Sequence, residues 1–179
     1  MDIRGSKTEQ NLNIAFSGES EARNKYTYFS SIAKKEGYNQ ISDIFEELAN
    51  NEKEHAKIWF KYLNGGEIQL TKENLKTAIE GENVEWTKMY KEFADTAIEE
   101  GFHEIAEKFK MVSNIEKIHE RRLKKYLDML ESDTLFKKEN KVMWVCKNCG
   151  HIHCGEKAPD TCPFCNHSKS FFEVSKCEH

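Results

Sequence analysis

The motif Glu-x-x-His occurs at two places where its side chains could bind a metal ion. The two copies are Glu52 with His55 and Glu116 with His119. Residues i and i+3 are neighbours on the surface of an α-helix, so each pair can reach one ion. A third copy, Glu100 with His103, spans a predicted helix break and is interpreted as a chance match. One such motif is weak evidence, because a Glu on a helix is most often solvated.

Four segments of the chain repeat apolar residues every three or four positions, as amphipathic helices do. The repeating positions are Leu12, Ala15, Glu19, Ala22, Tyr26, Phe29 and Ala33; Ile41, Phe45, Leu48, Glu52, His55, Trp59 and Tyr62; Leu75, Ala78, Glu82, Glu85, Met89, Phe93 and Ala97; and Ile105, Phe109, Val112, Glu116, His119, Leu123 and Tyr126. Glycines at Gly65, Gly66 and Gly101 mark breaks between the segments. The pattern predicts an all-α four-helix bundle.

Charged side chains interrupt each of these apolar stripes near its middle. A buried carboxylate without a partner is costly, and several in one core would require cations to neutralise them. The order Glu, Glu-x-x-His, Glu, Glu-x-x-His along four helices is typical of ferritin-like di-iron carboxylate proteins. Mixed carboxylate and imidazole ligands favour iron or manganese. The sequence therefore predicts a di-metal site built from Glu19, Glu52, His55, Glu82, Glu85, Glu116 and His119.

A second kind of metal site is indicated by the cysteines, all 6 of which lie near the C-terminus. Four of them form two Cys-x-x-Cys pairs, Cys146 with Cys149 and Cys162 with Cys165. Two such turns predict a tetrahedral site of four thiolates, which suits iron or zinc. The residues Gly150 and Pro163 match rubredoxin turns, but zinc ribbons use similar ones. The remaining Cys154 and Cys177 are expected to be free thiols, and His151, His153, His167 and His179 to be solvated.

Composition limits the classes of protein to which the chain can belong. It has 179 residues, of which 32% are charged, and a formal net charge of -4. These values favour a helical globular protein and give no reason to expect nucleic acid or a membrane as partner. No segment resembles a membrane span or signal peptide, so we expect a cytoplasmic protein. The Cys-rich tail predicts two domains, residues 1–135 as the bundle and 136–179 as the four-cysteine domain.

Beyond these patterns, the sequence resembles rubrerythrin along nearly its whole length. The matching stretches are SGESEARNKYTYF (17–29), NNEKEHAK (50–57), GENVEWTKMY (81–90) and IEKIHERR (115–122), followed by the rubredoxin-like tail. The resemblance implies a ferritin-like di-iron bundle with an Fe(Cys)4 domain. Ferritins lack both the tail and the second carboxylate of the Glu82-x-x-Glu85 pair.

The resemblance also implies a role for each residue. Glu19 and Glu82 are expected to be terminal carboxylates, Glu52 and Glu116 to bridge the irons, and His119 to bind one iron. His55 and Glu85 are expected to exchange as ligands of the other iron when its oxidation state changes. Tyr26 and Tyr90 follow their carboxylates on the same helix faces and resemble tyrosines near the family's site. Ordinary core packing remains the alternative for the two tyrosines.

The link between the second and third predicted helices is short. The second should end near Leu63, and the third should begin at Thr71, a residue that favours helix N-caps. Parallel packing within one bundle would need a link of about 28 Å along the axis and about 10 Å sideways. Eight extended steps reach about 28 Å at most. We therefore expect a domain-swapped homodimer, in which Glu19, Glu52 and His55 share a site with the second-half ligands of another chain.

The function expected from the resemblance is a peroxidase that reduces hydrogen peroxide to water and protects against oxidative stress. Electrons would come from NADH or NADPH through a separate reductase or rubredoxin and the Fe(Cys)4 centre. The chain has no Gly-rich dinucleotide fingerprint, so no bound nicotinamide or flavin is expected. One alternative is a ferroxidase or iron-storage protein. Another is a zinc-ribbon binding module attached to a structural bundle.

Overall fold

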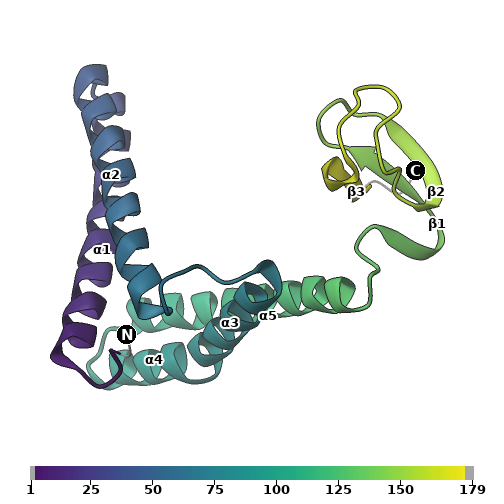
Figure 1. The fold of residues 1–179 in the computed structure, drawn as a ribbon. Coiled ribbons are helices and arrows are strands. Elements are labelled where there is room, and N and C mark those ends of the chain that lie inside the picture. The colour runs from purple at the N-terminus through teal and green to yellow at the C-terminus, as the bar shows by residue number, and fades with distance from the viewer. Residues whose placement is uncertain (1–2, 176–179) are drawn as a thin grey trace. The chain divides into compact units, whose positions relative to one another are not determined.

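The computed structural model describes residues 3–175 as four helical rods followed by a small sheet (Figure 1). The rods are α1 (Lys7–Lys35), α2 (Asn39–Leu63), a third rod made of three pieces, and α5 (His103–Glu131). The pieces of the third rod are α3 (Thr71–Val84), a π-helical turn η1 (Glu85–Met89) and α4 (Tyr90–Glu99). The prediction of four helices is therefore confirmed. Cys177 and His179 lie outside the described residues.

The helices begin and end where the sequence supplies suitable residues. Ser6 caps α1 by accepting a hydrogen bond from the Glu9 backbone N–H at 3.0 Å. Gly37 and Gly101, with φ of 86° and 83°, end the first and third rods in left-handed backbone, which glycine adopts without steric cost. The expected N-cap at Thr71 is off by one residue. Leu70 occupies the cap position and Thr71 is the first helical residue.

The four rods pair as two antiparallel hairpins. In the first hairpin α1 packs on α2, and in the second α3, η1 and α4 pack on α5. The chain divides into two compact units, residues 1–69 and 70–179, so each hairpin is described by itself. Among the described residues, none of the helices is long and apolar enough to cross a bilayer.

Small residues line the seam inside each hairpin. In α2 they are Ser42, Ala49 and Ala56, and in α5 they are Ala106 and Ser113, with the larger Glu120 at the third position. Spacing by seven places these residues on one helix face, where small side chains allow the paired helices to approach closely. Five of the six are buried, and Ser113 is half-buried. The apolar stripes predicted from the sequence lie beside this seam, and several of their side chains are exposed, including Phe29, Ile41 and Leu48 in the first hairpin and Phe93 and Ile105 in the second.

The C-terminal region is a three-stranded antiparallel sheet with strand order β2-β1-β3. The strands are β1 (Lys137–Cys146), β2 (Ile152–Lys157) and β3 (Phe172–Val174). Its small core contains Trp144, Ala158 and Phe172 together with the buried thiols of Cys146 and Cys162. The Trp144 indole N–H donates to the Gly155 carbonyl at 2.9 Å, which satisfies the polar atom of a fully buried ring. The sheet thus holds the first cysteine pair at the end of its central strand.

Candidate metal centres

The first hairpin brings Glu19, Glu52 and His55 together. Ligand atoms of these three side chains all lie within 4.8 Å of one another. His55 Nδ1 lies 2.8 Å from Glu52 Oε2 and 3.8 Å from Glu19 Oε1. Glu19 comes from α1, whereas Glu52 and His55 occupy one face of α2. The two helices therefore position a site of two carboxylates and one imidazole.

The second hairpin repeats this arrangement with Glu82, Glu116 and His119. Their ligand atoms also lie within 4.8 Å of one another. His119 Nδ1 lies 2.7 Å from Glu116 Oε2 and 3.6 Å from Glu82 Oε1. These distances match those of the first triad to within 0.2 Å. Two separate helix pairs have thus built the same donor set.

The two hairpins also correspond residue by residue. Glu52 and His55 precede their counterparts by 64 positions (116 − 52 and 119 − 55), whereas Glu19 precedes Glu82 by 63. An aromatic cluster beside each triad follows the offset of 64: Tyr26, Phe29 and Phe45 in the first hairpin; Tyr90, Phe93 and Phe109 in the second. The Phe29–Phe45 and Phe93–Phe109 ring centroids are both 5.6 Å apart.

The π-helical turn explains the change of offset from 63 to 64. A π-turn is wider than an α-turn by one residue, and the Tyr90 N–H accordingly donates to the carbonyl of Glu85, five residues earlier. The extra residue lies between Glu82 and Tyr90, so Tyr90 still joins its aromatic cluster. The offset of 63 places Glu85 opposite Ala22, so the second hairpin has a carboxylate where the first has an alanine. Burial first, and also the Glu85 charge, raise the pKa of both Glu82 and Tyr90, so the Glu85 carboxylate lies near the second triad.

Neighbouring groups shift the pKa values of the triad carboxyls. The Glu52 carboxyl first, and then burial, raise the pKa of Glu19, whereas Glu19 and His55 lower the pKa of Glu52. In the second triad, burial first and then Glu116 raise the pKa of Glu82. Its Oε2 atom is buried without a hydrogen-bond partner in the described part of the chain. A buried carboxylate oxygen without a donor fits a metal cation, and binding of the cation would favour the deprotonated carboxylates.

The phenols of Tyr26 and Tyr90 lie in the aromatic clusters next to the triads. Burial, then the charges of Glu85, Glu116 and Glu82, raise the pKa of Tyr90, so its hydroxyl stays protonated at neutral pH. Within residues 3–175 no hydrogen bond joins either phenol to a carboxylate. The Tyr90 hydroxyl is nevertheless near enough to Glu85, Glu116 and Glu82 for their charges to act on it.

Two residues near the triads were not singled out from the sequence. Trp59 of α2 has a buried indole N–H that donates no hydrogen bond within the described residues. The indole N–H nevertheless lies close enough to Glu19 to lower the pKa of the Glu19 carboxyl against larger effects that raise it. Glu120 of α5 is 4% exposed and accepts from Asn83 Nδ2 at 2.9 Å, Trp86 Nε1 at 2.7 Å and Lys124 Nζ at 2.7 Å. Glu120 thereby connects α5 to both α3 and the π-helical turn. Its position seven residues after Ser113 on the buried seam was the available signal.

The four paired cysteines converge at the end of the sheet. Their sulfur atoms all lie within 4.8 Å of one another, and the Cys146–Cys165 and Cys149–Cys162 Sγ distances are both 3.7 Å. The two turns have the same backbone: Gly150 N–H donates to Cys146 O, and Asn166 N–H to Cys162 O. Both donors have positive φ, 77° and 60°. Asn tolerates this left-handed conformation, so it can replace the glycine of the first turn.

Backbone N–H groups adjust the acidity of the thiols. The His167 N–H first, and then neighbouring thiols, lower the pKa of Cys165 to about 6 against the effect of burial. The His151 N–H lowers the pKa of Cys149, but burial and three neighbouring thiols outweigh it and raise that pKa. Four sulfur atoms that converge in this way fit one tetrahedral metal ion, which would bind them as thiolates.

The other tail residues differ in part from expectation. Cys154 is an exposed free thiol, as expected. His151, His153 and His167 are half-buried, although solvated side chains were expected. His153 lies in β2, and the His167 ring meets the edge of the Phe171 ring at 4.5 Å between centroids. None of the three belongs to the four-sulfur cluster.

Comparison with known proteins gives matches along the whole described chain. A family model described as "Rubrerythrin" matches residues 10–127 and 73–144, and one described as "Rubrerythrin, rubredoxin-like domain" matches residues 144–173. Rubrerythrin of Porphyromonas gingivalis is 46% identical over 188 residues, covering 99% of this chain and 94% of that protein. Rubrerythrin of Nitratidesulfovibrio vulgaris is 43% identical, covering 96% of each. A solved structure of nigerythrin in a mixed-valence state is 28% identical with a TM-score of 0.36, covering 94% of this chain and 86% of that one.

Proposed function

This chain belongs to the rubrerythrin family, and from that premise we propose that it is a non-haem di-iron peroxidase that reduces hydrogen peroxide to water. Its fold is the family's ferritin-like helical bundle with a small C-terminal region bearing four cysteines. We place the domains at residues 1–135 and 136–179. The observation that carries the proposal is the presence, in one chain, of two matching Glu-Glu-His triads and a four-sulfur cluster.

The triads supply donors for two iron ions. Seven residues would hold them: Glu19, Glu52, His55, Glu82, Glu85, Glu116 and His119. Bound ferrous iron would supply the two electrons of the reaction H₂O₂ + 2 H⁺ + 2 e⁻ → 2 H₂O. Glu85 and His55 would alternate as ligands of one iron, and the π-helical turn that carries Glu85 supports this because such turns are common at functional sites.

Protons for the reaction are available from the chain itself. Glu19 and Glu82 both have raised pKa values, for the reasons given above, which favours their protonated forms. The Tyr90 hydroxyl is kept protonated and lies in the same acidic environment. We propose that these groups donate protons to the peroxide oxygens and that Tyr26 assists from the first hairpin.

Electrons would return through one iron in the Cys146, Cys149, Cys162 and Cys165 cluster. Zinc would fit four thiolates equally well, but only iron can transfer electrons. We propose NADH or NADPH as the original source, acting through a separate reductase or rubredoxin. A reducing compartment such as the cytoplasm would keep the thiols available for iron.

The link between the hairpins supports a domain-swapped homodimer. α2 ends at Leu63 and α3 begins at Thr71, as the sequence predicted, and residues 71–80 are helical. If α3 packed parallel to α2 in the same bundle, the link would have to cover more than the distance that eight extended steps can span, about 28 Å. The exposed apolar side chains of each hairpin, such as Phe29 and Phe93, supply the surface for a partner. Each site would then combine the first triad of one chain with the second triad of the other.

Reactivity with the two oxidants tests the peroxidase. Anaerobically reduced, iron-loaded protein is mixed with hydrogen peroxide and, separately, with oxygen, and oxidation is followed optically. We expect much faster oxidation by peroxide. Faster oxidation by oxygen would instead favour a ferroxidase. A colourless protein that contains zinc in the tail would remove the proposed electron path.

Complementation tests the swapped dimer. Chains carrying Glu52→Ala and chains carrying Glu116→Ala are co-expressed with different tags, and the heterodimer is purified. In a swapped dimer both lesions fall in one site, so the other site is intact and about half of the activity per dimer returns. Without swapping, each site carries one lesion and the heterodimer stays inactive. Heterodimers of two differently tagged Glu52→Ala chains provide the control.

A further inference from the structure

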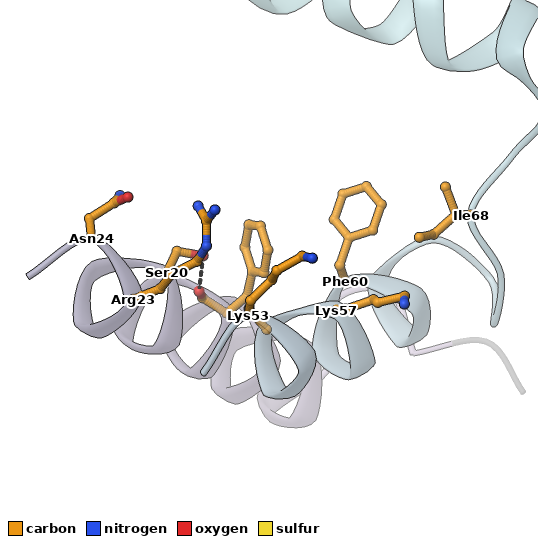
Figure 2. Close-up of a pocket in the computed structure, with 9 residues that line it drawn as sticks. Ser20, Arg23, Asn24, Lys53, Lys57, Phe60 and Ile68 are labelled. Carbon is orange, nitrogen blue, oxygen red and sulfur yellow. Dashed lines mark hydrogen bonds between the residues drawn. The ribbon is translucent and has the colours of Figure 1, made fainter. Parts of the chain in front are cut away.

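A hollow of about 480 Å³ opens on the first hairpin, between α1 and α2 (Figure 2). Its apolar lining comes from Phe16, Ala56, Phe60 and Ile68. None of the triad residues Glu19, Glu52 and His55 lines it, although Ala56 directly follows His55. The volume falls in the range of about 300–1,000 Å³ that is usual for small-molecule sites. The hollow is thus separate from the proposed iron site.

The rim of the hollow is positively charged. Arg23, Lys53 and Lys57 line it, and no carboxylate does. Figure 2 shows these three side chains on the same side of the hairpin as the Phe60 ring. Lys57 Nζ lies 3.1 Å from Glu54 and Lys53 Nζ 4.0 Å from it, so the two lysines share one acidic neighbour. Among the residues that the structure describes, the Arg23 guanidinium has no ion pair.

The second hairpin shows what fills the same place there. Arg23 corresponds to Trp86 by the offset of 63, and Ala56 to Glu120 by the offset of 64. At that place the Trp86 indole N–H donates to the Glu120 carboxylate at 2.7 Å. Lys117, the counterpart of Lys53, lies 4.8 Å from the Trp86 ring centroid. An aromatic ring and a carboxylate beside lysines therefore occupy in the second hairpin the groove that is hollow in the first.

We propose that the hollow binds an organic anion with a flat apolar body and one carboxylate. The body would lie against Phe16, Ala56 and Phe60, where the indole lies in the other hairpin. The carboxylate would accept hydrogen bonds from the Arg23 guanidinium, whose planar fork suits carboxylates. Lys53 and Lys57 would add positive potential at the rim. This ligand supplies from solution the two groups that Trp86 and Glu120 supply from the chain.

Titration calorimetry of the full-length, iron-loaded protein tests the proposal with indole-3-butyrate as probe. We expect one probe to bind per chain. The neutral analogue indole-3-butanol, which keeps the ring and loses the charge, should bind about tenfold or more weakly, as expected for loss of a charge-assisted hydrogen bond. Equal affinity for the acid and the alcohol, or no binding at millimolar probe, would overturn the proposal.

Three variants locate the site. Arg23→Gln should weaken binding of the acid about tenfold and leave binding of the alcohol unchanged. Ala56→Glu places a carboxylate where Glu120 has one and should abolish binding of the acid. Lys108→Gln removes one charge from an exposed residue of α5 outside the hollow and should change nothing. Circular dichroism checks that each variant is folded, and an Arg23→Gln protein that binds the acid normally would sink the proposal even if Ala56→Glu failed to fold. The test does not read peroxidase activity, so its result is independent of the proposed function.

Discussion

The first and second hairpins hold the same three ligand types at nearly the same distances, but they support them differently. In the second, a buried carboxylate, Glu120, connects α5 to Asn83 and Trp86, and Glu85 begins a π-helical turn. In the first, Ala56 and Arg23 stand in the corresponding places and leave a hollow. The same donor set is therefore compatible with two different surroundings, one with a buried carboxylate and one with a hollow.

Removal of one carboxylate from either triad should have the largest effect. We expect Glu52→Ala and Glu116→Ala each to lower kcat/KM for peroxide by more than about 100-fold, because even outer partners of metal ligands are worth about 10–100-fold. Iron per chain and peroxide consumption are the measurements. Glu54→Ala, an exposed neighbour on α2, is the control and should retain activity. If only one of these two variants lost peroxidase activity, the two triads would not be equivalent in function.

Deletion of Thr87 would give the third rod the residue spacing of α1, with the tyrosine seven residues after the carboxylate. The deletion removes the extra residue of the π-helical turn, so a regular helix can carry Tyr90 and Phe93 back to their cluster with Phe109. We expect circular dichroism to show full helix content, while peroxidase activity falls about tenfold or more, as for loss of a partner of the metal site. Wild-type activity in the deletion variant would show that the turn has no part in function.

Glu120→Ala tests the support that only the second hairpin has. Truncation leaves the Trp86 and Asn83 donors unpaired, and we expect unfolding free energy to fall by about 3 kcal/mol in urea titrations. Glu107→Ala on the same helix is the matched control. Glu107 is exposed and pairs with Lys110 at 2.7 Å, so its loss should cost about 0.5 kcal/mol or less. Similar losses in the two variants would contradict the structural role of Glu120.

A smaller, pH-dependent effect is expected at the end of the second hairpin. Lys72 Nζ lies 2.9 Å from Glu131 and lowers the pKa of that carboxyl below its ordinary value of 4.5. A lowered folded-state pKa stabilises the fold above the ordinary value, and the contribution disappears as the pH falls through the folded value. Glu131→Gln should therefore lower the melting temperature slightly at neutral pH and have no effect in strong acid. Lys72→Gln should show the same loss at neutral pH, and a difference that persists in acid would exclude this pair as its cause.

Sequence periodicity predicted the parts of the fold that depend on local spacing. The triads could be found because Glu52 and His55 share a helix face with Leu48 and Trp59, and the link ends at Leu63 and Thr71 follow from apolar pattern and glycine. The π-helical turn was visible only indirectly. Tyr90 lies eight residues after Glu82, but Tyr26 lies seven after Glu19, and one extra residue changes a helix locally without breaking its apolar stripe.

The partners of Glu120 and the hollow could not be predicted, for a different reason. The spacing from Ser113 indicates that Glu120 lies on the seam, but it does not show which donors Glu120 meets across the hairpin. Asn83 and Trp86 come from another helix, and no pattern in α5 specifies which donors that helix presents. Likewise Ala56 fits an ordinary helix seam, and the space beside it depends on Phe16 and Ile68 from elsewhere in the chain.

The raised pKa of Glu19 bears on how the protein would mature. A carboxyl group with a raised pKa keeps its proton to a higher pH than an ordinary glutamate does, so protons and metal ions compete for the first triad. Delivery of iron then becomes an exchange in which protons leave as the ion enters. Such an exchange proceeds more readily as the pH rises, and cellular iron supply would determine when a folded precursor becomes an active protein.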